Sequence, residues 1–417
     1  MEGVEVVLAW LFLFALRGVS VAAALQPSGG LALAGARIYT APAEQPVMDG
    51  VVVVEGGKIV AVGPRRATTI PPGVRVLDVA GHTVTAGFWN SHVHFTEMKW
   101  AGAATVPASE LTEQLQEMLT RFGFVHVFDT GSPLENTGAI RRRIDAGEVL
   151  GPSIHTTGMI LFPQGGTPPV DLIRALGFMP VERSEIATAG EALAALARTL
   201  DGGADGIKLY AMTWFGRPVA MPAEVLEAAT REARRRGKLV FAHPTNTTGL
   251  SRAVAAGVDV IVHTTPESGP WSVDLIADMK AKRVALIPTL KLWRWETRRG
   301  RRSLAQPWIE AGVAQLRAYS AAGGTILFGT DVGYMDDYDP AVEYEMMSRA
   351  GLGFAQILAS LTTAPAERFG VASQTGRIAP GLDADLVVLE RDPSADVRGF
   401  AAVRYAFRKG VIVYGPR

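Results

Sequence analysis

The central part of the sequence repeats one unit, a short apolar run followed by a helix-like segment. The runs that we expect to form strands are the one ending at His94 and then Phe124–Asp129, Ser153–Thr157, Gly206–Tyr210, Leu239–His243, Val258–His263, Val284–Thr289 and Thr325–Asp331. Helices are expected between them, for example over Ala223–Arg236 and Pro307–Ala322. Eight strand–helix units in series predict an α/β chain with a closed (β/α)8 TIM barrel.

Both ends of the chain read as β-structure. Val51–Val62 contains two strand-like runs around a Gly56-Gly57 turn, Ala384–Leu389 is a further run, and Val403–Val413 reads as a hairpin turning at Lys409-Gly410. We therefore predict a small β-sandwich domain assembled from both chain ends. The predicted domains are 27–84 with 372–417 for the β-sandwich, and 85–371 for the barrel.

The first 26 residues differ from the rest in composition. Val6–Leu16 is apolar but short for a membrane span, and Ala22-Ala23-Ala24 has the pattern of a cleavage site. Residues 1–26 are therefore predicted to be a secretory signal peptide, which implies a secreted or periplasmic protein without a stable membrane span after removal. The segment holds Glu2 and Glu5 and no Lys or Arg before the apolar run, so an uncleaved apolar tail or a mis-assigned start remains an alternative.

Composition limits the chemistry. The 41 basic residues balance 41 acidic ones, so the net charge does not favour a nucleic-acid partner. Cysteine is absent, and any metal site must therefore use His, Asp, Glu or Lys. A small-molecule substrate is the expected partner, and a homo-oligomer is an open alternative.

Polar side chains stand where several predicted strands end. His92 and His94 are two residues apart in a strand, so their side chains point to the same face and form half of a metal-ligand set. The others are Lys208, His243, His263 and Asp331. Burying one such group without a partner costs about 1–3 kcal/mol. Because active sites of TIM barrels lie at the carboxyl ends of the strands, we expect all six to converge on bound metal.

With this ordered set, the chain resembles the amidohydrolase superfamily of metal-dependent hydrolases. Val84–His94 resembles the family's approach to its His-x-His motif, and Gly376–Leu389 resembles its Gly-x-x-x-x-Gly-x-x-Ala-Asp-Leu-Val-x-Leu return. Among the branches, the chain looks most like the imidazolonepropionase-related group that includes Xaa-Pro dipeptidases. Asn90 departs from the pattern, because an Asp is common at that position.

The resemblance implies a binuclear centre with two divalent metal ions, expected to be zinc. His92, His94 and Asp331 would bind one ion and His243 and His263 the other. Lys208, carboxylated on its side-chain nitrogen by CO2, would bridge them. Asp331 would also be the catalytic residue, taking a proton from the metal-activated hydroxide and passing it to the leaving amine.

Two further residues are candidates for substrate contact. Tyr210 follows Lys208 on the same face of its strand and is suited to hydrogen-bond a substrate oxygen, although simple packing is the alternative. His155 is expected near the strand ends, with a structural role equally open. His126 reads as a core histidine. The loops Trp293–Arg302 and Gly333–Asp339 are expected to line the substrate pocket.

These features predict a dipeptidase-like amidohydrolase that cleaves the amide bond of a dipeptide or an N-acyl amino acid. The sequence does not identify the substrate or the metal. A lactonase or cyclic-amide hydrolase on the same binuclear site is the first alternative. A catalytically inactive metal-binding protein is a second alternative, of a different class, which the complete ligand set disfavours.

Overall fold

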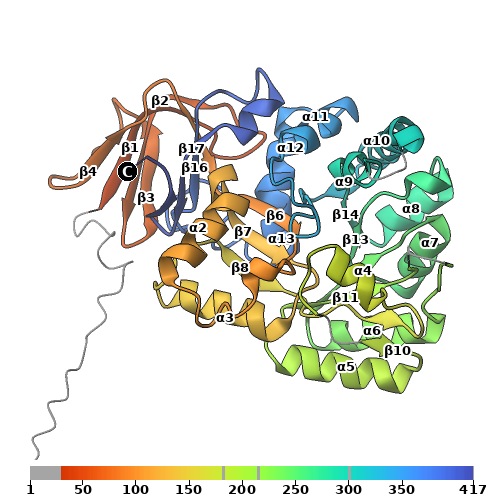
Figure 1. Ribbon diagram of the computed structural model, residues 1–417. Coiled ribbons are helices and arrows are strands. Elements are labelled where there is room, and N and C mark those ends of the chain that lie inside the picture. Colours follow the sequence, from red (N-terminus) through yellow and green to blue (C-terminus); the bar gives the residue numbers. More distant parts are fainter. Residues whose placement is uncertain (1–29, 181–183, 214–216, 299–301, 417) are drawn as a thin grey trace, which may run out of the picture.

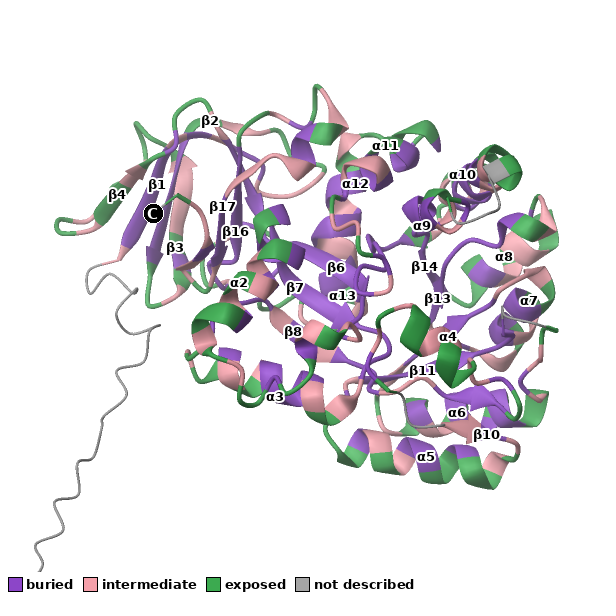
Figure 2. Cartoon of the chain, in the orientation of Figure 1, coloured by how far each residue is buried: buried purple, intermediate pink, exposed green. Residues whose placement is uncertain are grey.

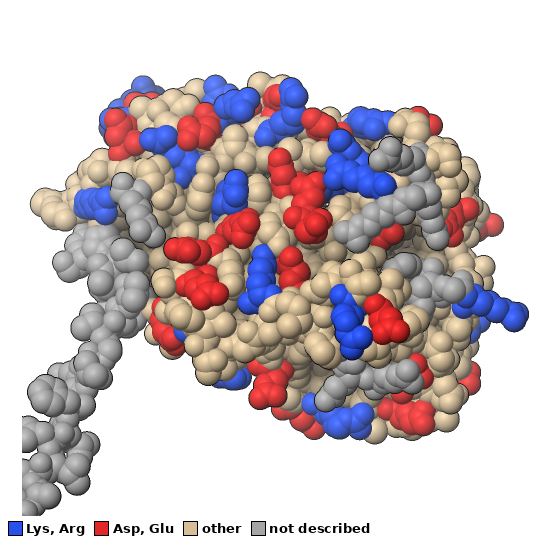
Figure 3. Space-filling model, in the orientation of Figure 1, with Lys and Arg blue, Asp and Glu red and all other residues tan. Residues whose placement is uncertain are grey.

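The computed structural model describes residues 30–416 except 181–183, 214–216 and 299–301 (Figure 1). The predicted signal peptide, residues 1–26, lies outside the described residues. Within the described part of the chain, no helix is long and apolar enough to cross a membrane. Lys and Arg are interspersed with Asp and Glu over the face drawn in Figure 3.

Strands from both chain ends form one eight-stranded sheet, on the left of Figure 1. Its path runs β18-β17-β16-β5-β1-β2-β3, and β4 pairs with β1. The strands are β1 (Leu31–Ile38), β2 (Val47–Glu55), β3 (Lys58–Pro64), β4 (Arg75–Asp78), β5 (Thr83–Ala86), β16 (Leu386–Leu389), β17 (Val403–Arg408) and β18 (Val411–Tyr414). Both predicted hairpins are present, and Gly56 and Gly57 both have the positive φ that the tight turn requires. The two-sheet sandwich and the domain boundaries stay predictions.

Eight parallel strands form the α/β part, in two sheets. One sheet contains β6 (Phe88–Val93), β7 (Phe124–Asp129) and β8 (Ser153–Thr156). The other contains β11 (Gly206–Tyr210), β12 (Leu239–His243), β13 (Val260–Val262), β14 (Ala285–Ile287) and β15 (Thr325–Ile326). The chain thus has a TIM-barrel-like domain, but the pairing does not run continuously around it.

Isolated backbone hydrogen bonds, and not continuous ladders, span the two gaps between these sheets. The Ser91 N–H donates to the Phe328 carbonyl at 2.8 Å, and the Leu161 N–H donates to the Lys208 carbonyl at 2.9 Å. The predicted last strand was too long, since β15 ends at Ile326 and the Phe328 N–H donates to the Ser360 carbonyl of a later helix instead of a neighbouring strand. Asp331 has φ +64° and His263 has φ +75°, which are left-handed values that end a strand. β13 thus stops directly before His263, whereas Asp331 follows the end of β15 by five residues.

Helices cover the outer faces of the strands. They are α2 (Ala108–Met118), α3 (Leu134–Asp145), α5 (Ala189–Asp201), α6 (Ala223–Arg235), α7 (Thr247–Ala256), α8 (Val273–Ala281), α9 (Leu290–Glu296), α10 (Ala305–Ala321), α11 (Ala341–Arg349), α12 (Phe354–Leu361) and α13 (Thr363–Arg368). The two helices predicted from the sequence correspond to α6 and α10 and are confirmed to within two residues at each end. A further short helix, α4 (Val170–Ala175), lies in the long connection between β8 and β11.

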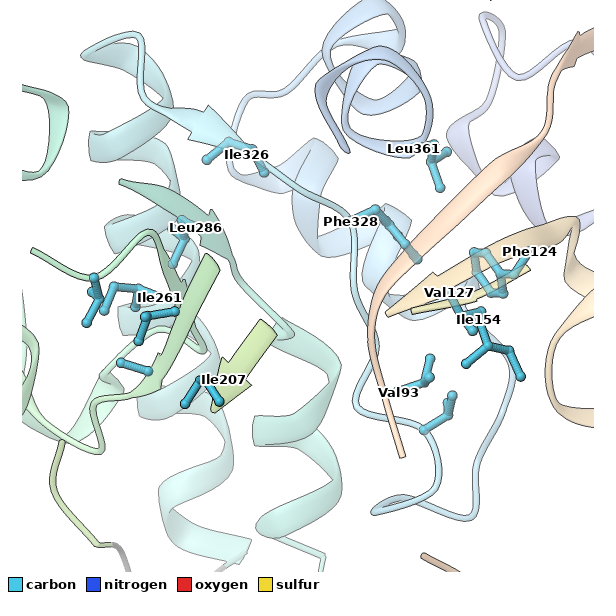
Figure 4. Packing of buried hydrophobic residues seen from close by; sticks show 14 of the residues in the cluster. Val93, Phe124, Val127, Ile154, Ile207, Ile261, Leu286, Ile326, Phe328 and Leu361 are labelled. Carbon is cyan, nitrogen blue, oxygen red and sulfur yellow. The ribbon is translucent and has the colours of Figure 1, made fainter. Parts of the chain in front are cut away.

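Most residues of the parallel strands are buried, as Figure 2 shows in purple. On β13, Ile261 belongs to the large core shared with the helices, while Val260 and Val262 belong to a second core on the other face. Alternate side chains of one strand thus fill two apolar layers, which is typical of parallel sheets. Figure 4 shows Phe328 between the labelled side chains of the two strand groups, and its ring stacks on Phe124 at 5.6 Å.

The chain passes from the β domain into the first barrel strand through Gly87. The Gly87 N–H donates to the Asp385 carbonyl, and a Cβ at Gly87 would lie 2.3 Å from Val125 Cγ2. A side chain at this position would therefore push the first barrel strand away from its neighbours.

Gly87→Ala should lower the free energy of unfolding by about 1–3 kcal/mol, because overpacking of this order costs that much. Urea unfolding followed by circular dichroism measures the change. Gly190→Ala is the control, since only Thr188 Oγ1, at 4.0 Å, approaches that position. Equal stability of the two variants would contradict the prediction.

Candidate metal centre

Three predicted ligands meet in one place. His92 Nε2 and His94 Nε2 each lie 3.0 Å from Asp331 Oδ1, and the two nitrogens are 3.2 Å apart. All three residues are buried. Donor atoms that share one metal at about 2.0–2.1 Å are themselves separated by roughly 3.0–3.4 Å. The donor set and its spacing therefore fit a divalent metal ion.

The ring nitrogens on the other side of these histidines are held by protein oxygens. His92 Nδ1 lies 3.0 Å from Thr130 Oγ1, and His94 Nδ1 lies 3.1 Å from the Gly131 carbonyl. His263 Nδ1 lies 2.6 Å from Thr289 Oγ1. If each Nδ1 keeps the ring proton and donates it, each Nε2 lone pair is left for a metal.

The other predicted ligands lie beside this cluster. The His263 ring is 4.9 Å from the His92 ring and 4.6 Å from the His243 ring, and His263 Nε2 lies 4.0 Å from Asp331 Oδ2. Lys208 is buried on β11. All six predicted ligands line the same cavity, whose volume is about 540 Å³. Within the described residues, the close group of donors comprises only His92, His94 and Asp331.

Burial sets the charge states of the centre. It lowers the pKa of His92 to about 3, with a further contribution from Lys208, and it lowers the pKa of Lys208 to about 7. Burial alone would raise the pKa of Asp331, but the adjacent imidazoles, above all that of His92, outweigh it and hold this pKa well below its ordinary value. Neutral imidazoles around an ionised carboxylate are the protonation states that metal ligands require.

Asn90 links β6 to the segment after β15 that carries Asp331. Its amide nitrogen donates to Thr330 Oγ1 at 2.6 Å, and its carbonyl oxygen accepts from the Thr330 N–H at 3.2 Å and from the His92 N–H at 3.3 Å. An ionised Asp has no donor for the Thr330 hydroxyl. Asn90, where the family commonly has Asp, thus connects Thr330, the neighbour of Asp331, to the backbone of His92 through an uncharged side chain.

The two candidate substrate contacts are placed differently. Tyr210 lines the cavity, and its ring stacks on His243 at 4.3 Å and on Phe162 at 4.7 Å. His155 is not among the lining residues. Its ring packs against Trp89 at 5.4 Å and Phe128 at 5.6 Å, so the structure does not support the predicted substrate contact.

His126 is a core histidine, as predicted, with Nε2 3.0 Å from Asp385 Oδ2. Sequence reasoning missed Thr130, although a signal was present. Asp129 ends a predicted strand in the same way as the ligands do, and its carboxylate accepts hydrogen bonds from Ser132, Thr137 and Thr156. This network fixes the turn that carries Thr130.

Comparisons with known proteins agree with this geometry. The sequence model of the amidohydrolase family matches residues 83–413, so the chain belongs to the amidohydrolase family. It is a metal-dependent hydrolase that acts on carbon–nitrogen bonds.

Three similar proteins support the predicted branch. Ochratoxinase of Aspergillus niger is 25% identical over 374 residues, covering 79% of this chain and 75% of that protein. A solved structure from Bifidobacterium longum, assigned as a prolidase, is 27% identical with a TM-score of 0.77, covering 93% of this chain and 96% of the other. A Xaa-Pro dipeptidase with bound methionine has a TM-score of 0.79 at 20% identity, covering 93% and 100%, and shows the shared fold.

Thr130→Val should weaken metal binding about 10- to 100-fold, because the change removes the oxygen that orients the His92 ring. Equilibrium titration of zinc against a competing chelator measures the affinity. Thr105→Val is the matched control, since Thr105 is exposed and its hydroxyl donates to the Gly102 carbonyl at 3.2 Å, away from the metal centre. Equal affinities for the two variants would show that Thr130 does not position the ring.

Proposed function

We propose that this protein hydrolyses the amide bond of a dipeptide or an N-acyl amino acid at a binuclear metal centre. One observation carries the proposal. The donor atoms of His92, His94 and Asp331 lie 3.0–3.2 Å apart at the buried end of a cavity of about 540 Å³ that also holds Lys208, His243 and His263. A cavity of this size accepts a small molecule and not a folded protein.

The close group would hold one divalent ion, and His243 with His263 would hold the second. Zinc is the metal proposed, because the set is made of imidazole and carboxylate donors. When bound, such ions lower the pKa of a water molecule and polarise a carbonyl. The protein residues then orient the substrate and move the proton.

Lys208 is suited to bridge the two ions in modified form. Burial brings its pKa to about 7, so a substantial fraction of the amine is neutral near neutral pH. The neutral nitrogen can form an N–C bond with CO2, which yields a carbamate and releases one proton. The carbamate is anionic and offers two oxygens, whereas a protonated lysine has no lone pair to donate.

Asp331 is placed to shuttle the proton of the reaction. Its carboxylate is ionised and lies against both ligand imidazoles, so it can accept a proton from the attacking water. It can then donate that proton to the leaving amine as the C–N bond breaks. The Tyr210 side chain lines the same cavity and is suited to contact the substrate oxygen.

Asp331→Asn should reduce kcat by at least about 10²- to 10⁴-fold, which is the contribution of a positioned proton shuttle. The melting temperature should change little, because the amide fills the same volume. Turnover should be measured on a library of dipeptides, N-acyl amino acids and lactones, with metal content determined in parallel. Full activity of the variant would rule out the proposed proton transfer.

Lys208→Ala should abolish turnover and lose metal, and millimolar acetate or propionate should restore part of both. A free carboxylate can occupy the space left by the carbamate and supply the two bridging oxygens. Chloride at the same ionic strength and the surface variant Lys282→Ala are the controls, since Lys282 is exposed and, among the described residues, pairs with Asp278 four positions earlier. Full activity of Lys208→Ala without any added anion would exclude the bridge.

A further inference from the structure

The cavity is lined mainly by apolar side chains once the metal centre is set aside. These residues come from several elements and include Met98, Met159, Ile160, Phe162, Leu172 and Trp293. The charged residues among the described lining, outside the centre, are Arg174, Glu267 and Glu296. Arg174 pairs with Asp171 at 3.3 Å, and Glu296 accepts a hydrogen bond from Tyr334 at 2.5 Å. Most of the cavity wall therefore offers a substrate apolar contact surface and no charged partner.

One wall is aromatic and adjoins the metal centre. The Trp293 ring lies 6.3 Å from the His263 ring and 5.9 Å from the Trp308 ring, edge to face in both cases. The Trp293 indole N–H donates to Thr264 Oγ1 at 2.8 Å, which fixes the ring. A group attached close to the scissile bond would reach this wall.

A second wall is the short helix α4 and the residues that follow it. Val170, Leu172 and Ile173 of α4 line the cavity, as do Leu176 and Phe178. None of the residues of α4 is buried, although four of its six residues are apolar. The exposed fraction of Val170 is 54%. Covering these side chains with an apolar group is favourable, because it removes their apolar surface from water.

We propose that the substrate carries a bulky apolar group, preferentially aromatic, next to the scissile amide. This group would lie between the Trp293–Trp308 pair and the apolar side chains of α4. The inference rests on the proposed function, since it specifies which amides the same site accepts. It makes Val170, Trp293 and Trp308 specificity-determining residues of this chain.

Two series of substrates test the proposal with the full-length, metal-loaded protein. In the first, the amine is alanine and the acyl group changes from acetyl to 2-naphthoyl. In the second, the acyl group is acetyl and the amino acid changes from alanine to 2-naphthylalanine. We expect kcat/KM to rise at least about tenfold with the aromatic group in one series or both, since roughly 100 Å² more apolar surface is buried. No increase in either series would overturn the proposal.

A matched pair of variants locates the effect. Val170 and Val273 are both exposed and both begin a helix, but only Val170 lines the cavity. Val170→Asp should reduce the preference for the naphthyl substrate at least fivefold, mainly through KM, while Val273→Asp should keep it within twofold. Trp308→Ala should act like Val170→Asp. The same preference for the naphthyl substrate in all three variants would show that these walls do not contact the apolar group.

A binding measurement separates this inference from the proposed reaction. 2-Naphthoate and acetate need no turnover, and quenching of tryptophan fluorescence or calorimetry reports their binding to the metal-loaded protein. We expect naphthoate to bind at least tenfold more tightly than acetate, and we expect Val170→Asp, but not Val273→Asp, to weaken this binding. That result supports the apolar site even if every amide in the library resists hydrolysis. Equal binding of the two acids would overturn the inference, even for an active amidohydrolase.

Discussion

The contact between His92 and Asp331 is the interaction on which the site depends. The residues are 239 positions apart in the chain, yet their side chains lie 3.0 Å apart and their backbones are hydrogen-bonded from the Asp331 N–H to the His92 carbonyl. A buried carboxylate is costly unless it is paired. Here the Nε2 atoms of His92 and His94 lie 3.0 Å from Asp331 Oδ1, and a metal ion bound between these atoms would supply the pairing.

The same contact lies where the two parallel sheets approach each other. β6 belongs to one sheet, and the segment after β15 continues the other. The Ser91 and His94 backbone N–H groups reach the Phe328 and Val332 carbonyls across this gap. Asn90 adds a side-chain bridge to Thr330. The fold and the metal centre thus share one set of contacts, so a change that opens this gap would weaken both.

The pattern of strands and helices was largely readable from the sequence. β7, β11 and β12 coincide with their predicted bounds, because apolar runs bounded by polar residues mark buried parallel strands clearly. The last strand was predicted too long, because the apolar sequence does not reveal that the Phe328 N–H donates to the Ser360 carbonyl of α12 and not to a strand. The close donor set was also predicted, since its members stand at strand ends. The sequence left open whether His155 contacts substrate or has a structural role, because the residues that pack around it come from other strands.

The sequence by itself determined which residue types stand at the ends of the parallel strands, and hence the metal chemistry and the family. The tertiary structure alone decided what surrounds them. Thr130 and Thr289 orient histidines from other strands, and Trp308 and α4 reach the cavity from distant segments. These contacts depend on how loops of different length fold back over the strands. No local pattern encodes that geometry, because it follows from packing between residues far apart in the chain.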